Sequence, residues 1–455
     1  MKAELHMPVS MTVSLGGDIH VVVCEETLRV LGARRLVVRG RCAKGQVVVK
    51  AFFGSRAPRY RRREEAGIRA LMRCGVAVPE LLGSGVLAEG GEYVVNTFVA
   101  GVVPDRSDID ALTRILARLH EGGVLHTDPH IANFIKTDGV LYAVDGDAVR
   151  VCRVHRGPRH RVSERKSLGN LARLCAELDV IDVASPLASY CDQRGWRATA
   201  SKEAALAALT ADARERRVAK FVRKTLRECS EFSFSQTAGQ VSICARAACC
   251  GELDRLLADL DGHVESGESL KRGNTATVSR VRLGAKKVYV VKRYNVKSLL
   301  HRLRIGLRTS RARRSWMNGN RLMFQDIPTA RPVAMIERRS GIAFYVMENL
   351  EGLDLVEFIE SHGLDETTLN GVVRIFASLR AAGLQHGDTK ATNFIVTADG
   401  VFVVDLDALG PAKGSAGHDR DVRRFLENWR EPDVRSKFQH ALMERKIDGF
   451  EKNQP

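Results

Sequence analysis

The sequence predicts an α+β protein with two tandem domains of similar design, each with a β-rich first part and a helical second part. Three observations lead to this prediction. The chain has 455 residues, which is too long for one ordinary core, and its 44% hydrophobic and 27% charged residues are typical of globular proteins. A polar motif occurs twice, once in each half. In both halves, strand-like segments and then a helix-like apolar stripe precede this motif.

Each half begins with a predicted β-hairpin whose second strand ends in a lysine. The strands of these hairpins are predicted at 35–40 and 46–52 in the first half, and at 277–283 and 288–294 in the second. A basic, helix-prone stretch follows each hairpin, then a Pro-containing strand entry, and then a further strand at 93–98 or 343–348. Both halves are therefore expected to open with β-structure.

A helix is predicted directly before each copy of the polar motif, because apolar residues recur there at helical spacing. The stripe consists of Leu112, Ile115, Leu116 and Leu119 in the first half and of Leu369, Val372, Val373, Phe376 and Leu379 in the second. Gly122–Gly123 and Gly383 are expected to end these helices. The polar motifs are thus expected on loops between the β-rich and helical parts.

The boundary between the two domains is predicted near Leu260–Gly262. The first domain is expected to cover 1–260, with its β-rich part ending at about residue 100. The second is expected to cover 261–455, with its β-rich part ending at about residue 350. Residues 151–255 are helix-prone and have no counterpart of similar length after Asp407.

The repeated motif reads HTDPHIANFI at 126–135 and HGDTKATNFI at 386–395. A short apolar strand follows each copy and ends in an acidic pair, DGD at 145–147 and DLD at 405–407. In both copies the first aspartate precedes the asparagine by five residues, and the asparagine precedes the next aspartate by twelve. Two segments that share this order of acid, amide and acid predict a duplicated site for phosphate and metal.

Phosphoryl transfer needs a cation for the donor phosphates, ligands for a metal ion, and an acid that orients the acceptor hydroxyl. Lys50 and Lys292 are predicted to reach nucleotide phosphates. Asp128 and Asp388 are the candidates that would align the acceptor or accept its proton.

Four residues of the two motifs offer hard oxygen ligands of the kind that Mg²⁺ prefers. They are Asn133, Asp145, Asn393 and Asp405. The second acids, Asp147 and Asp407, fit an outer supporting or turn-capping role as well as a metal-binding one.

The pattern HxDxxxxN, followed by a strand and DxD, resembles the catalytic core of the protein-kinase-like fold. Phenylalanine after the asparagine, and DxD in place of DFG, resemble the bacterial lipopolysaccharide core heptose kinases, the WaaP and InaA-like group. The segments at 292–295 (KRYN) and 313–316 (RRSW) are also similar to that group. The resemblance covers most of the chain as two tandem copies. It implies two protein-kinase-like domains, each with a β-rich N-lobe and a helical C-lobe, that use ATP and Mg²⁺ to phosphorylate a core sugar, a heptose.

The two copies depart from the kinase pattern in different ways. Neither has a GxGxxG loop. Glu64 of the first copy is placed to pair with Lys50 and is therefore a candidate cofactor-binding residue, whereas the second copy has no acidic residue between Arg293 and Gln325.

The second copy has the more kinase-like catalytic loop and hinge. Lys390 follows Asp388 by two residues, where kinases of this fold often place a lysine near the transferring phosphate, so Lys390 is a candidate catalytic residue. Glu348, in the hinge-like segment 347–350 (MENL), is a candidate cofactor-binding residue. These departures allow either of the two copies to be degenerate.

The net charge of +17 predicts an anionic partner, which is nucleic acid, a membrane surface or a phosphorylated substrate. Basic stretches lie at 56–63 and 297–314, and leucines interleave the second, as suits the headgroup region of an anionic membrane. A solvated helix face explains them equally well. Nucleic acid is disfavoured because aromatic residues, which would stack on the bases, make up only 6%.

A cytoplasmic protein, peripheral on the inner membrane if the basic stretches bind it, is the expected location. No apolar run approaches the ~18 residues that span a bilayer, and the first residues do not read as a signal peptide. The ten cysteines form no CxxC pair, which favours free thiols.

Three functional hypotheses remain from the sequence. The first is a kinase for an anionic glycolipid, the lipopolysaccharide core, at the cytoplasmic face of the inner membrane. The second is a nucleotide-binding pseudokinase or scaffold for envelope biosynthesis. The third is a protein Ser/Thr/Tyr kinase.

Overall fold

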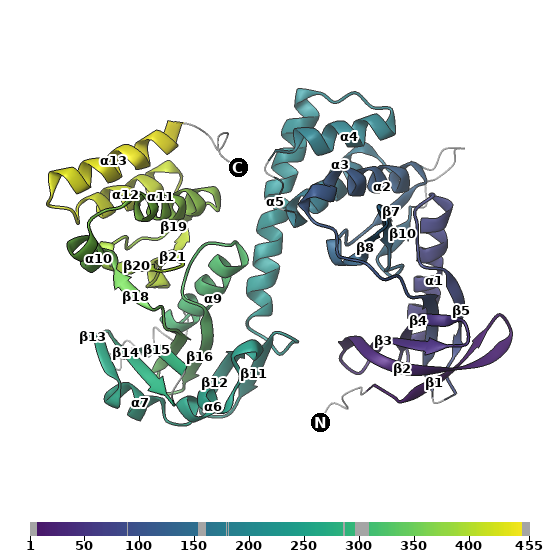
Figure 1. Cartoon of the computed structure of the whole chain (residues 1–455), viewed down its shortest axis with the longest axis horizontal. Coiled ribbons are helices and arrows are strands. Elements are labelled where there is room, and N and C mark those ends of the chain that lie inside the picture. Colours follow the sequence, from purple (N-terminus) through teal and green to yellow (C-terminus); the bar gives the residue numbers. More distant parts are fainter. Residues whose placement is uncertain are drawn as a thin grey trace. The chain divides into compact units, whose positions relative to one another are not determined.

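The computed structural model describes residues 7–88, 90–152, 161–178, 180, 182–284, 287–295 and 309–447. It divides the chain into two compact units, Met1–Arg216 (unit 1) and Arg217–Pro455 (unit 2), and the division falls within helix α5 (Figure 1). Both units contain a large antiparallel sheet and a group of helices. The predicted α+β class is therefore confirmed.

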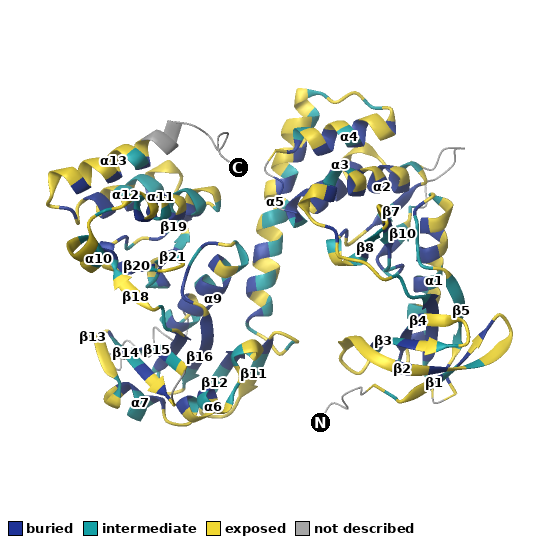
Figure 2. Cartoon of the chain, viewed as in Figure 1, coloured by how far each residue is buried: buried dark blue, intermediate teal, exposed yellow. Residues whose placement is uncertain are grey.

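The β-rich part of unit 1 is a six-stranded antiparallel sheet in the order β1-β2-β3-β4-β6-β5. Its strands are β1 (Ser10–Leu15), β2 (Asp18–Leu31), β3 (Arg35–Cys42), β4 (Gly45–Phe52), β5 (Leu81–Val86) and β6 (Glu92–Thr97). Helix α1 (Ala57–Arg73), which has a proline in its first turn, follows the predicted hairpin β3–β4. In Figure 2 most of β2 is exposed, whereas β4 is buried along most of its length.

The remainder of unit 1 is mainly helical. Its elements are α2 (Ile109–Glu121), β7 (Val124–His126), β8 (Phe134–Thr137), β9 (Val140–Ala143), β10 (Val149–Val151), α3 (Glu164–Glu177), α4 (Ala184–Arg194) and α5 (Ala200–Lys224). The predicted apolar stripe of α2 is buried in the main core of the unit, which α3 and α4 complete. The loop with the first polar motif lies between β7 and β8. Ile131 and Phe134 of the motif segment pack in or against this core.

The β-rich part of unit 2 is a seven-stranded antiparallel sheet in the order β11-β12-β16-β17-β15-β14-β13. Its strands are β11 (Phe232–Gln236), β12 (Gln240–Ala245), β13 (Glu268–Arg272), β14 (Ala276–Leu283), β15 (Lys287–Tyr294), β16 (Pro332–Arg338) and β17 (Ala343–Glu348). The associated helices are α6 (Gly251–Ala258), α7 (Leu260–Ser266) and α9 (Arg311–Phe324).

Two expectations for the middle of the chain differ from the structure. The segment 151–255 is not helical throughout, because β11 and β12 pair with each other and β12 pairs with β16. The compact units divide at Arg216–Arg217, so residues 217–259 belong to unit 2, ahead of the boundary expected at Leu260–Gly262. The pairing of β12 with β16, which lies far along the chain, is not revealed by local propensity.

The helical part of unit 2 carries the second polar motif. Its elements are β18 (Gly352–Asp354), α10 (Leu355–His362), α11 (Glu366–Ala381), β19 (Leu384–Gln385), β20 (Phe394–Thr397), β21 (Gly400–Val403), β22 (Gly410–Pro411), α12 (Ser415–Leu426) and α13 (Pro432–Ile447). The predicted stripe of α11 packs in a core with Phe394, Phe425 and Phe438. Gly383, with a φ of 64°, follows α11 as predicted.

The second predicted basic stretch, 297–314, lies largely outside the described residues. Among the residues that the structure describes, none of the helices is long and apolar enough to cross a membrane.

Candidate active sites

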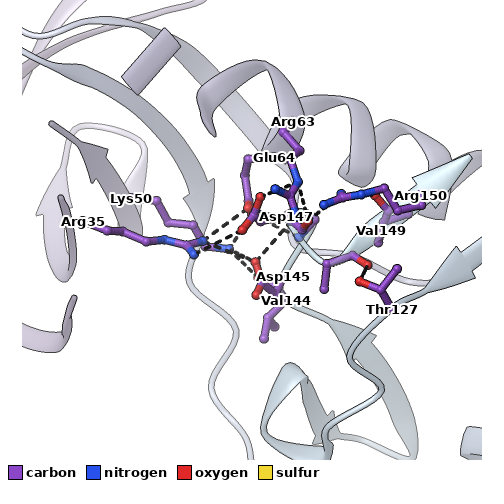
Figure 3. Close-up of polar contacts among 12 residues, drawn as sticks. Arg35, Lys50, Arg63, Glu64, Thr127, Val144, Asp145, Asp147, Val149 and Arg150 are labelled. Carbon is purple, nitrogen blue, oxygen red and sulfur yellow. Dashed lines mark hydrogen bonds and ion pairs between the residues drawn. The ribbon is translucent and has the colours of Figure 1, made fainter. Parts of the chain in front are cut away.

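In unit 1, the predicted phosphate-binding lysine lies beside the predicted glutamate and the predicted metal-ligating aspartate (Figure 3). The Nζ atom of Lys50, on β4, forms an ion pair with Oε1 of Glu64, on α1, and lies 3.5 Å from Oδ1 of Asp145. It also donates a hydrogen bond of 2.7 Å to the carbonyl oxygen of Val144. Lys50 is 7% exposed and Glu64 is fully buried. Three residues that are distant in the sequence thus form one cluster, in which Lys50 and Glu64 are buried and Asp145 is half-buried.

Arg35 extends this cluster, since its Nη2 atom lies 3.4 Å from both Glu64 Oε2 and Asp145 Oδ1. Burial opposes the charged form of Asp145, but Lys50 and Arg35 outweigh it and lower the pKa of Asp145 to about 2. Burial raises the pKa of Glu64. The carboxylate of Asp145 therefore stays charged at neutral pH and remains able to attract a cation.

Two glycines allow α1 to contact the acidic pair of unit 1 directly. A Cβ atom on Gly67 would lie 1.9 Å from the carbonyl oxygen of Gly146, and one on Gly146 would lie 2.3 Å from that of Glu64. This close approach lets Glu64 accept hydrogen bonds from the N–H groups of Gly146 at 3.2 Å and Asp147 at 2.9 Å. The glycine between the two acids is thus a packing requirement.

In unit 2, Lys292 has two aspartate partners in place of a glutamate. Its Nζ atom forms an ion pair with Oδ1 of Asp405 and lies 3.1 Å from Oδ2 of Asp407. Lys292 is 5% exposed. Helix α9 contains no acidic residue that could play the part of Glu64. Asp405 and Asp407 of the second motif pair with Lys292 instead.

Asp407 is held by three residues that the sequence interpretation did not identify as part of the site. Tyr294 and Ser315 donate hydrogen bonds of 2.6 Å and 2.5 Å to its Oδ1 atom, and Nε of Arg311 donates one of 3.0 Å to Oδ2. Burial opposes the charge on Asp407, but Lys292 and these three donors outweigh it and lower the pKa of its carboxyl. Asp407 is therefore a fixed anion that orients Lys292. The sequence signal for Ser315 and Tyr294 was their place in the RRSW and KRYN segments.

The loops of the repeated motif are closed by the same hydrogen bonds in both units. The side-chain amide of Asn133 donates to the carbonyl oxygen of Asp128 at 3.0 Å, and that of Asn393 donates to Asp388 at 2.8 Å. A backbone N–H from the strand before each acidic pair donates to the carbonyl oxygen of the same asparagine, at 2.9 Å in unit 1 and 2.8 Å in unit 2. Asn133 therefore links Asp128 to the segment that leads to Asp145, and Asn393 links Asp388 to the segment that leads to Asp405.

In unit 2, a buried carboxylate of α12 holds the backbone ahead of the candidate catalytic aspartate. Asp421 accepts hydrogen bonds from the N–H groups of His386 at 2.6 Å and Gly387 at 2.9 Å. Gly387 has a φ of 79°, and a Cβ atom there would lie 3.0 Å from the carbonyl oxygen of Ala408. A glycine is therefore needed where the second peptide N–H turns towards α12.

In unit 1, the corresponding peptide bond has the opposite orientation relative to its supporting helix. Asn170 of α3 donates a hydrogen bond of 2.8 Å to the carbonyl oxygen of His126, whereas the N–H of Thr127 points to the carbonyl oxygen of Ala148 at 2.8 Å. The carbonyl group, and not the N–H group, thus faces the helix. The supporting side chains match these two orientations. Unit 2 has an acceptor, Asp421, and a glycine at 387, whereas unit 1 has a donor, Asn170, and a threonine at 127.

A chain of buried hydrogen bonds fixes the donor role of Asn170. Arg194 donates to the hydroxyl of Tyr190 at 2.6 Å, and Tyr190 lies 2.7 Å from Nδ1 of His120. Nε2 of His120 lies 2.9 Å from Oδ1 of Asn170, whose amide nitrogen donates to His126. Because arginine only donates and a carbonyl only accepts, every link is satisfied when Tyr190 donates to Nδ1 and a neutral His120 donates from Nε2.

Acidification is expected to weaken this chain and to destabilise unit 1. Burial lowers the pKa of His120 to about 4, so the unfolded chain takes up a proton below its ordinary value of 6.5 while the folded chain resists it. Stability is therefore full above pH 6.5 and falls between pH 6.5 and 4, by up to about 3 kcal/mol at 1.36 kcal/mol per pKa unit. Hydrogen exchange of peptides from α2 to α4 would measure the loss, and His120→Asn should flatten the profile. An unchanged slope in that variant would contradict the role of His120.

The candidate catalytic aspartate of unit 2 lies between two cations. Arg424, on α12, forms an ion pair with Oδ1 of Asp388, and Nζ of Lys390 lies 3.8 Å from Oδ2. The side chains of Lys390 and Arg424 are 50% and 47% exposed. Two cations therefore flank Asp388 at the surface of the unit.

The surroundings of Asp128 in unit 1 are different. Among the described residues, Asp128 has no ion pair, and Nε2 of His130 lies 3.0 Å from Oε1 of Glu177. Arg173 of α3 donates a hydrogen bond of 2.9 Å to the carbonyl oxygen of Thr127. His130, two positions after Asp128, is thus paired with a different acid, Glu177. Lys390, two positions after Asp388, faces Asp388 itself.

A pocket of unit 2 lies beside the ion pair of Lys292 and Asp405. It is lined by Lys292, Ser315, Thr329, Tyr345, Met347, Val404, Asp405 and Leu406. Glu348 does not line this pocket; it lies at the end of β17, where its Oε2 atom is 3.5 Å from Nε of the exposed Arg331. The structure therefore does not bring Glu348 together with the other candidate residues.

The residues that the structure describes contain no group of three or more His, Cys, Asp or Glu side chains that could hold a metal ion. The predicted magnesium ligands are an asparagine and an aspartate in each unit, which by themselves leave most coordination positions to phosphates and water.

Comparison with known proteins gives a family match in the second half of the chain. Residues 260–443 match the lipopolysaccharide kinase (Kdo/WaaP) family. Similar solved structures include a cysteine-to-alanine mutant of the kinase domain of PknI from Mycobacterium tuberculosis, with 15% identity, a TM-score of 0.29, and coverage of 47% of this chain and 100% of that one. The autoinhibited serine kinase domain of the giant muscle protein titin has 17% identity, a TM-score of 0.25, and coverage of 32% and 45%.

No curated protein matches the chain significantly. The match begins at residue 260, so the strands β11 and β12 precede the family domain within unit 2. The resemblance inferred from the sequence is confirmed in part, since residues 260–443 match the model of the lipopolysaccharide kinase (Kdo/WaaP) family.

Proposed function

We propose that the chain uses ATP to phosphorylate a sugar hydroxyl, on a heptose, of the lipopolysaccharide core, and that unit 2 catalyses the transfer. The family match over 260–443 supports the kinase class and the lipopolysaccharide substrate. The observation that carries the assignment to unit 2 is the pair of cations, Lys390 and Arg424, that flank Asp388, whereas Asp128 has no ion pair among the described residues.

In this proposal Asp388 aligns the acceptor hydroxyl and accepts its proton. Lys292, freed from Asp405 by nucleotide, would contact the donor phosphates, and Lys390 would contact the transferring phosphate. The half-buried Asp407 keeps Lys292 in place while Lys292 exchanges Asp405 for the phosphates. These roles need no covalent intermediate on the protein.

Asn393 and Asp405 fit a magnesium ion. The amide nitrogen of Asn393 is taken up by the carbonyl oxygen of Asp388, which turns its side-chain oxygen into the available ligand. Asp405 uses Oδ1 for Lys292 and retains Oδ2. Hard oxygen ligands of this kind suit Mg²⁺, which would neutralise the donor phosphates. Asn133 and Asp145 offer the same pair in unit 1.

We infer that unit 1 is a second, diverged copy that binds nucleotide without transferring phosphate. The cluster of Lys50, Glu64 and Asp145 supports nucleotide binding. The reversed peptide before Asp128 and the pairing of His130 with Glu177 favour a non-catalytic role. Unit 1 would then serve as the nucleotide-binding pseudokinase that the departures from the kinase pattern suggested.

The cytoplasmic face of the inner membrane is the proposed site of action. The net charge of +17 suits an anionic glycolipid and an anionic membrane surface. In the first basic stretch, Arg56, Arg59 and Arg62 are exposed. Nucleic acid is not proposed as a partner.

Transfer to a defined acceptor tests the proposal. Purified protein with Mg²⁺ and ATP labelled on the γ-phosphate should label deacylated lipopolysaccharide core, and mutants that lack the gene should lose phosphate from that core. No labelling, together with unchanged core phosphate in the mutants, would contradict the proposed function. Labelling of a protein in the absence of glycolipid would favour the protein-kinase alternative.

A further inference from the structure

We propose that Arg424 gates the acceptor site of unit 2: it covers Asp388 until an anionic group of the acceptor, a carboxylate or a phosphate near the reacting hydroxyl, draws it away. This inference rests on the proposed function and adds the chemical class of the acceptor. The reacting sugar must then carry, or lie next to, a negative charge.

The position of Arg424 is fixed by the same helix that fixes the catalytic loop. Asp421 and Arg424 are three residues apart on α12 and lie on one face of it. Asp421 is 5% exposed and binds the backbone of the loop, whereas the side chain of Arg424 is 47% exposed and reaches Oδ1 of Asp388. The guanidinium group is thus held at the aspartate and open to a ligand.

The ion pair conflicts with the proposed role of Asp388. While Arg424 binds Oδ1 and Lys390 lies 3.8 Å from Oδ2, both oxygens of Asp388 face a cation, which opposes the uptake of a proton from an acceptor hydroxyl. An ion pair between partly exposed partners is weak, and a guanidinium group binds a carboxylate or phosphate through two parallel hydrogen bonds. An acceptor anion can therefore compete for Arg424 and release Oδ1.

The transfer then balances without another reactant. The acceptor oxygen forms a bond to the γ-phosphorus of ATP, and the bond from that phosphorus to the β,γ-bridging oxygen breaks. ADP leaves with the electron pair of that bond, and the hydroxyl proton passes to Asp388.

Unit 1 lacks this arrangement although it has residues of the same kind. Arg173 lies three residues after Asn170, as Arg424 lies three after Asp421, but it binds the carbonyl oxygen of Thr127 and not Asp128. The basic residue two positions after Asp128, His130, is paired with Glu177. The gate is therefore specific to unit 2, which agrees with its proposed catalytic role.

Steady-state kinetics with matched acceptors tests the gate. The variants are Arg424→Gln, Arg424→Lys and the control Arg374→Gln, which removes an exposed arginine of α11. The acceptors are deacylated core oligosaccharide, the same oligosaccharide with its carboxyl groups reduced, the same oligosaccharide after removal of its phosphates, and water, measured as ADP release. The melting temperature of each variant shows whether it folds.

With wild-type protein, kcat/KM is expected to fall at least about tenfold for one of the two treated oligosaccharides, which identifies the anion as carboxylate or phosphate. Arg424→Gln should raise KM for the native oligosaccharide, erase this preference, and increase ADP release to water because Oδ1 is uncovered. Arg424→Lys should keep part of the preference, and Arg374→Gln should match wild type.

Equal kcat/KM for all three oligosaccharides with wild-type protein, or an equal loss for all of them in Arg424→Gln, would overturn the gate while phosphate transfer itself stood. If wild-type protein labels no oligosaccharide, the proposed function fails. The gate is then judged by ADP release to water, which must rise in Arg424→Gln for it to stand.

Discussion

Replacing Asp388 with asparagine is expected to lower kcat for phosphate transfer by about 10²–10⁴-fold, with little change in the KM for ATP. Asparagine keeps the size of the side chain and cannot accept the acceptor's proton. The change also removes the charge that holds Arg424. Release of Arg424 does not restore activity, because the uncovered residue is no longer a base. Labelling of deacylated core under saturating ATP measures the effect.

The matched variant Asp128→Asn separates the two units. Because Asp128 has no ion pair among the described residues and follows a reversed peptide, this change is expected to alter kcat by less than about threefold, well below the loss of a general base. A large loss in Asp128→Asn with full activity in Asp388→Asn would assign catalysis to unit 1. Loss in neither variant would favour a binding module.

Replacing Asp421 with asparagine is expected to cost both stability and activity. The buried carboxylate accepts two backbone N–H groups, and an asparagine amide can accept only through its single oxygen. One buried donor would lose its partner, which lowers the free energy of unfolding by about 1–3 kcal/mol. The loop would also shift, and a displacement of ~1 Å can lower kcat about 10²-fold.

Urea unfolding measures the change in the free energy of unfolding. The change in kcat is measured at a temperature at which the variant is folded. Asp399→Asn, in the turn between β20 and β21, is the control, because Asp399 is exposed. An Asp421→Asn variant with wild-type kcat would show that the two N–H contacts do not position Asp388. A matched Asn170→Asp change in unit 1 should be destabilising as well, since it places an acceptor opposite the carbonyl oxygen of His126.

The strands and helices nearest to the site were predictable because their signals are local. Alternating apolar residues predicted β3, β4, β14 and β15, and helical spacing predicted α2 and α11. The motif spacing and the strand pattern likewise predicted which acidic, amide and lysine side chains form a candidate site in each half. The structure brings Lys50 to Glu64 and Lys292 to Asp405. The roles of these residues, and a second copy of the fold in unit 1, stay predictions.

What the sequence by itself determined is the α+β class, the resemblance of residues 260–443 to the lipopolysaccharide kinase (Kdo/WaaP) family, and the lysine and acidic residues that the structure brings together in each unit. Only the tertiary structure decided that β11 and β12 join unit 2, that Asp407 replaces a helix glutamate as the anchor of Lys292, and that Asp421 and Asn170 hold their loops in opposite orientations. The physical reason is that periodicity and motif spacing follow from interactions between near neighbours along the chain. Strand-edge pairing and the choice of donor or acceptor on a supporting helix depend on residues that meet only after the chain has folded.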